Sequence, residues 1–151
     1  MSARSKARKR ALDVLFECEA RGLPFGATLD DRRADAAADR RSPPVAPYTE
    51  QIVLGVAAHQ QQIDALISAL AHGWDLDRMP AVDRNVLRVG VYEVLWSDEI
   101  PDAVAVSEAV TLVTDLSTDE SPGFVNGLLA RVVTDRDTIL ADLAAADTDP
   151  G

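Results

Sequence analysis

The segment from Val82 to Trp96 is apolar on nearly every side. Many of its side chains are β-branched, but the segment is too long for an ordinary strand, and its apolar residues recur with a period nearer 3.6 than 2. A helix without a polar side is normally buried at the centre of a bundle. The rest of the chain is therefore expected to supply helices that surround this one.

Five further segments have the apolar spacing of helices, with glycine or proline at most of their boundaries. Prolines 43, 44 and 47 forbid a continuous helix through that stretch and mark a linker. We expect an all-α fold of six to seven helices, with one domain over residues 1–144 and a disordered tail over 145–151. The five segments are the leader up to Gly22, residues 28–40, Tyr48 to Ala71, Pro101 to Leu116, and Ser121 through Leu143.

The first ten residues carry five positive charges and no acidic side chain. The remaining chain holds all 25 Asp and Glu, so a basic leader precedes an acidic body. Clustered cations suit a polyanion such as nucleic acid, because phosphate contacts dominate affinity through counterion release. A disordered solubilising arm is the alternative interpretation. The five cations are Arg4, Lys6, Arg8, Lys9 and Arg10.

Motifs that would carry catalysis are not found in the sequence. The two histidines and one cysteine lack metal-ligand spacing, and no glycine-rich loop follows a strand to hold a phosphate. We therefore expect no enzyme activity, no metal and no cofactor. No apolar run approaches the roughly 18 residues of a membrane span, and Asp13 and Glu17 interrupt any signal-peptide core, so we expect a cytoplasmic protein without membrane contact.

Five stretches of the chain follow one another in a recognisable series. They read RALDVLFE after the basic cluster, YTEQIVLGVAAHQQQID, WDLDRMPAVDRNVLRVGVYEVL, IPDAVAVSEAVTLV and SPGFVNGLL. In this series the chain resembles the NusB family of transcription antitermination factors. The resemblance implies two packed three-helix bundles and a non-catalytic adaptor that binds single-stranded boxA RNA of ribosomal RNA operons. It also implies two partners, the small ribosomal subunit protein NusE and the elongation complex with RNA polymerase.

The resemblance also assigns roles to individual residues. It implies that the basic leader contacts RNA and that Phe16 in the first helix does so too. Glu120 and Phe124, near the start of the last helix, match a segment that lies beside the RNA. Asp83 matches an acidic position of the partner-binding region. Core packing is the alternative for the two phenylalanines, and a place at a helix N-terminus is the alternative for Glu120.

Other conspicuous residues are expected to be structural. Arg88 lies in the most apolar helix and requires an acidic partner, for which Glu93 and Glu108 are the candidates. Trp74 is expected to anchor a helix junction, and Gly127 to allow two helices to approach closely.

Functions of a different class stay open beside the antitermination adaptor. A purely protein-interacting helical scaffold, whose leader binds an acidic partner, is the main alternative. An RNA-modifying enzyme is a distant third, because the NusB fold also occurs in RNA cytosine methyltransferases. Family members occur as monomers and dimers, so a homodimer is possible on the resemblance alone.

Overall fold

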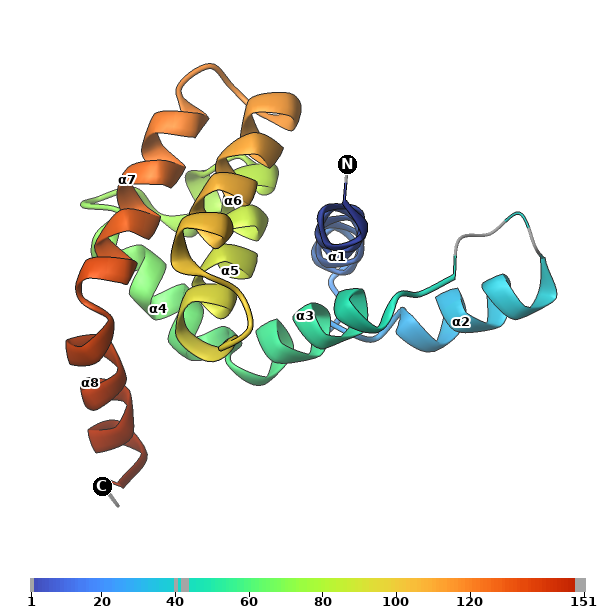
Figure 1. Cartoon of the computed structure of the whole chain (residues 1–151), viewed down its shortest axis with the longest axis horizontal. Coiled ribbons are helices and arrows are strands. Elements are labelled where there is room, and N and C mark those ends of the chain that lie inside the picture. Colours follow the sequence, from blue (N-terminus) through green and yellow to red (C-terminus); the bar gives the residue numbers. More distant parts are fainter. Residues whose placement is uncertain (1, 40, 42–43, 149–151) are drawn as a thin grey trace. The chain divides into compact units, whose positions relative to one another are not determined.

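The computed structural model describes residues 2–39, 41 and 44–148, and every regular element in that part is helical (Figure 1). The all-α prediction is confirmed. None of these helices combines the length and the apolar character needed to cross a membrane. The elements are α1 (Ala3–Ala20), α2 (Leu29–Ala38), α3 (Pro47–Ala58), α4 (Gln60–Leu70), the 3-10 turn η1 (Leu76–Arg78), α5 (Ala81–Trp96), α6 (Asp102–Leu116), α7 (Ser121–Thr134) and α8 (Arg136–Thr148).

The described part contains eight α-helices, so the expected count of six to seven is wrong. Two expected helices are each divided, one at His59 and the other at Asp135. Both residues have φ and ψ near the sparsely allowed region between helix and strand, with φ of −116° and −97°. The arrangement as two three-helix bundles stays a prediction.

The expected tail and linker fall partly outside the described residues. Helix α8 includes residues 145–148, which we expected in the tail, whereas residues 149–151 are not described. Residues 42 and 43 of the proline linker are likewise not described. Contacts divide the chain into two compact units, Met1–His59 and Gln60–Gly151. The single domain over 1–144 stays a prediction.

In the first unit, α1 packs along α3. The apolar face predicted for the first helix is confirmed, since each of its members is buried. The buried hydroxyl of Thr49 in α3 donates a hydrogen bond of 3.0 Å to the carbonyl oxygen of Ala7. This bond fixes α1 in rotation and in register against α3. The members of the face are Ala7, Ala11, Val14, Leu15 and Cys18.

In the second unit, α5 contacts α4, α6, α7 and α8, and all of its residues from Asn85 to Leu95 are buried. The expected central helix is therefore confirmed, and Figure 1 shows α5, α6 and α7 side by side. Close approach occurs at Gly90, where an added Cβ would lie 2.7 Å from Cδ1 of Leu129. The expectation for Gly127 is wrong, since a Cβ there would meet no described atom within 4 Å.

Arg88 of α5 finds its acidic partner on α4. Its Nε donates to Oδ1 of Asp64 at 2.8 Å and its Nη2 to Oδ2 at 3.2 Å, and Nη1 donates to Asn85. The side chain of Arg88 is 7% exposed, so this two-bond geometry is what makes its burial tolerable. The expected need for a carboxylate is met, although sequence reasoning did not name Asp64.

Candidate functional site

The leader is a regular helix from Ala3 onward. Its first turn contains no acidic side chain, so the positive end of the helix dipole lies among cations, an unfavourable arrangement. Ser2 offsets part of this cost, because its Oγ accepts a hydrogen bond of 3.1 Å from the backbone N–H of Ser5. The cap holds the cationic turns in helical geometry.

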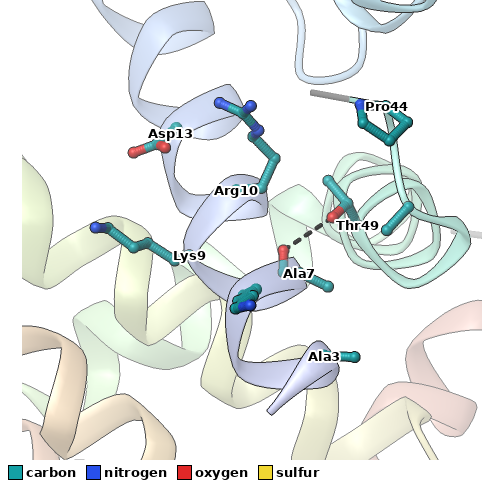
Figure 2. A pocket seen from close by; sticks show the side chains of 9 residues that line it. Ala3, Ala7, Lys9, Arg10, Asp13, Pro44 and Thr49 are labelled. Carbon is teal, nitrogen blue, oxygen red and sulfur yellow. Dashed lines mark hydrogen bonds between the residues drawn. The ribbon is translucent and has the colours of Figure 1, made fainter. Parts of the chain in front are cut away.

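A groove runs beside this helix, with a volume of about 510 Å³, and we call it the basic groove. Lys6 and Lys9 are exposed and Arg10 is half-buried, and none of the three forms an ion pair with another described residue. Figure 2 shows the side chains of Lys9 and Arg10 extending away from the helix axis, with Asp13 one turn further along. The lining residues are Ala3, Lys6, Ala7, Lys9, Arg10 and Asp13 from α1, and Pro44, Ala46 and Thr49.

The other two cations of the leader lie against an aromatic ring. The guanidinium carbons of Arg4 and Arg8 are 5.5 and 5.6 Å from the ring centroid of Tyr48, within cation–π range. Arg4 is exposed, but Arg8 is only 2% exposed. Its position one helical turn before the buried Leu12 is the sequence signal for this inward placement. Contact of Arg8 with RNA stays a prediction, and the structure gives this residue a packing role.

Phe16 lies on the same helix and is 45% exposed. Core packing, the structural alternative for this residue, does not describe its position. An exposed ring and exposed cations are thus both presented by α1. Whether the ring contacts RNA stays a prediction.

The second unit contains a hollow of about 470 Å³ that we call the aromatic hollow. It brings together four residues that the sequence analysis singled out, namely Trp74, Asp83, Glu120 and Phe124. The ring centroids of Trp74 and Phe124 lie 6.3 Å apart with a tilt of 37°, a common geometry for an aromatic pair. The lining residues are Trp74, Arg78, Met79, Pro80, Asp83, Thr118, Asp119, Glu120, Ser121 and Phe124.

Asp83 forms the inner wall of this hollow and is only 3% exposed. Its Oδ1 accepts a hydrogen bond of 2.6 Å from Ser117 Oγ, and its Oδ2 accepts one of 2.8 Å from Ser121 Oγ. The carboxylate therefore ties the first turn of α5 to the turn between α6 and α7. Contact of Asp83 with a protein partner stays a prediction.

Glu120 and Phe124 line the same hollow. Glu120 is exposed and occupies the N-cap position of α7, yet its side chain makes no capping hydrogen bond. Its carboxylate is thus available to a ligand at the rim. Phe124 is half-buried beside Trp74.

Sequence reasoning missed Trp74 as a surface residue. It is 54% exposed, although its ring contacts Phe124 of α7, and its role as a helix-junction anchor stays a prediction. The signal was the Gly73 that precedes it, which has a φ of +93° and ends the α4 region. Among the described residues, no group of three His, Cys, Asp or Glu side chains is placed to hold a metal ion.

Comparison with known proteins shows the family to which most of the chain is similar. A sequence model described as the NusB family matches residues 5–134. The transcription antitermination protein NusB of Nocardioides sp. is 58% identical over 139 residues, which are 92% of this chain and 99% of the relative. The same protein of Thermobifida fusca is 52% identical over 131 residues, covering 87% of this chain and 89% of the relative.

Solved structures of NusB proteins are also similar to this chain, at lower sequence identity. NusB of T. maritima matches with a TM-score of 0.74 and 27% identity over 93% of this chain and 98% of that one. A structure of the antitermination factors NusB and NusE in complex with dsRNA matches with a TM-score of 0.72 and 25% identity, over 87% of this chain and 96% of that one.

Proposed function

Since this chain belongs to the NusB family, we propose that it is a non-catalytic RNA-binding adaptor in transcription antitermination. Its RNA is the single-stranded boxA element of ribosomal RNA operons, and it binds this RNA together with the ribosomal protein NusE. The assembly acts on the elongation complex with RNA polymerase in the cytoplasm. Its similarity to antitermination proteins, and to a NusB chain solved with NusE and dsRNA, supports this proposal.

The observation that carries the proposal is the basic groove. Three cations without acidic partners among the described residues project from one capped helix, in a chain whose net charge is −10. An acidic protein does not adhere to RNA through its general surface, so the affinity must come from such a local cluster. Lys6, Lys9 and Arg10 bind phosphates in this proposal.

The remaining proposed contacts have separate roles. Arg4 adds a further phosphate contact, and the exposed ring of Phe16 stacks on a base. Phe124 and Glu120 contact a base in the aromatic hollow, where a carboxylate accepts hydrogen bonds from the base edge but repels phosphate. The buried Arg8 stabilises α1 by packing against the ring of Tyr48.

NusE is expected to be basic, and the acidic body of this chain complements such a partner. Asp83 braces the surface near the α6–α7 turn in this proposal. Because Asp83 is buried, direct contact with the partner falls to exposed carboxylates elsewhere on the acidic body. A homodimer stays an open alternative, which sedimentation with and without RNA decides.

The test is a binding titration of labelled boxA RNA and a scrambled RNA of the same composition, over a range of salt concentrations. We expect tighter binding to boxA, with a log–log salt slope of about −3 for four neutralised phosphates on a single strand. Equal and weak binding to both RNAs would favour the protein-interacting scaffold. Adding NusE measures whether the partner increases the affinity for boxA.

A further inference from the structure

We infer that Trp74 is a second base-stacking ring, and that Trp74 and Phe124 together receive one unstacked nucleobase in the aromatic hollow. The inference rests on the proposed RNA-binding function and adds a specificity-determining residue to it. The observation behind it is the juxtaposition of two rings and an acceptor-rich rim in one hollow.

Trp74 has the highest exposed fraction of the large apolar side chains exposed in the described part of the chain. A tryptophan that is 54% exposed leaves apolar surface in contact with water. A base that stacks on it would remove this apolar surface from water, and stacking on a ring is available to every base because each has a π-face. The neighbouring Phe124 extends the same apolar wall.

The rim of the hollow has polar groups that suit both the base and the phosphate of a nucleotide. Asp119 and Glu120 are exposed carboxylates that accept hydrogen bonds, and the amino groups of cytosine, adenine and guanine donate them. Arg78, which is 81% exposed and only loosely paired to Asp75 at 3.9 Å, offers a place for the phosphate of that nucleotide.

The backbone before Trp74 forms a tightly specified turn. His72 and Gly73 both have positive φ, of 48° and 93°, so the turn is tightly specified. Nη1 of Arg131 in α7 donates a hydrogen bond of 2.6 Å to Nε2 of His72. This bond links the turn to the helix that carries Phe124, so the backbone of the turn needs little reordering when a ligand binds.

The first experiment compares Trp74→Ala, Trp74→Phe and the wild type in titrations with boxA RNA. Base–aromatic stacking is worth about 1–3 kcal/mol, and one of two rings is removed, so we expect Trp74→Ala to bind about 5- to 20-fold more weakly. The salt slope should not change, because tryptophan carries no charge. Trp74→Phe should recover most of the affinity. Val104→Ala, at another exposed apolar residue of the same unit, is the matched control and should bind as the wild type.

The second experiment identifies the base. Single abasic sites are placed along the boxA RNA, and each is titrated against wild type and Trp74→Ala. At one position the abasic RNA should make the two proteins equivalent, because the ring then has no base to contact. A penalty of Trp74→Ala that persists at every abasic position would overturn the inference.

The two proposals fail in different ways. If the wild type binds boxA and scrambled RNA equally weakly, the proposed function and this inference both fall. If the wild type selects boxA and Trp74→Ala binds it equally well, only this inference falls. A lysine-rich peptide serves as the protein probe. A loss of affinity for the peptide without a loss for RNA would assign the hollow to a protein partner and overturn the inference.

Discussion

The basic groove and the aromatic hollow have opposite chemistry. The described lining of the groove has three cations, one carboxylate and no ring, whereas that of the hollow has two rings, three carboxylates and one cation. Cations bind any phosphate chain with an affinity that falls as salt rises, while rings and carboxylates respond to bases and hardly to salt. The difference shows how one protein can separate strength of RNA binding from choice of RNA sequence.

The largest expected effect comes from neutralising the groove with Lys6→Gln, Lys9→Gln and Arg10→Gln together. Losing three phosphate contacts should weaken boxA binding on the order of 50- to 100-fold near physiological salt and make the salt slope shallower by about 2. Fluorescence anisotropy at several salt concentrations measures both quantities.

The matched control for that variant is Arg21→Gln, Arg33→Gln and Arg41→Gln, which removes the same charge from positions outside the groove. We expect this control to change the affinity less than threefold. Equal losses in the two triple variants would mean that net charge, rather than the groove, governs binding.

A smaller effect is expected from Asp83→Ala, which removes the brace of the hollow. Ser117 and Ser121 would lose their shared acceptor, so the free energy of unfolding should fall by about 2–3 kcal/mol. Urea titration measures this change. Asp119→Ala, at an exposed carboxylate of the same hollow, should stay within about 0.5 kcal/mol of the wild type.

Helix α7, which carries Phe124, reaches α5 through Gly90, and alanine there should lower stability by about 1 kcal/mol. Crowding against the buried Leu129 costs about 1–3 kcal/mol, and the better helix propensity of alanine offsets part of this cost. Gly127→Ala, where a Cβ meets open space, should instead stabilise by about 0.5–1 kcal/mol. Thermal unfolding of both variants tests the contrast, and a stabilised Gly90→Ala would contradict it.

The smallest effect concerns the unit that contains the groove. A hydrogen bond from Arg32, helped by the charges of Arg32 and Arg21, holds the pKa of Glu17 below its ordinary value. A carboxylate with a lowered pKa in the folded state stabilises the fold above its unfolded pKa, and this contribution is lost as the pH falls through the folded pKa. Because Glu17 is 36% exposed, the contribution should stay below about 0.5 kcal/mol.

The measurement for Glu17 is the difference in unfolding free energy between wild type and Glu17→Gln at several pH values. The difference should be present at pH 7 and disappear between about pH 5 and pH 3. A difference that grows on acidification would contradict the assigned sign.

Apolar spacing predicted the helices because it reports which side of a segment is buried. The face from Ala7 to Cys18 and the buried α5 were recovered in this way. The breaks at His59 and Asp135 were not, since neither involves glycine or proline and the helical spacing continues past both. The pairing of Asp64 with Arg88 was not predicted for another reason. Which side chains pair between two helices depends on how the helices pack, and local spacing carries no information on that packing.

The candidate site was recovered in part. The sequence and the family resemblance pointed to Asp83, Glu120 and Phe124, and these do line one hollow. The charge pattern counted the cations of the leader correctly but did not distinguish Arg8, which turns inward. The exposure of Trp74 was not predicted because large aromatic residues are usually anchors, and only the backbone of the preceding turn places this ring in solvent.

The hydrogen bond from Thr49 to Ala7 has a consequence for how this family member can change over evolutionary time. It restrains the rotation of α1. Lys6 and Arg10 lie one helical turn apart, so their spacing along the helix axis is fixed at about 6 Å. Exchanging lysine for arginine leaves the spacing of the cations along α1 unchanged. Inserting a single residue between Lys6 and Ala7 would turn Lys6 by about 100° relative to Arg10 and point it elsewhere. The leader should therefore tolerate the exchange of one cation for another and resist a change of length directly before Ala7.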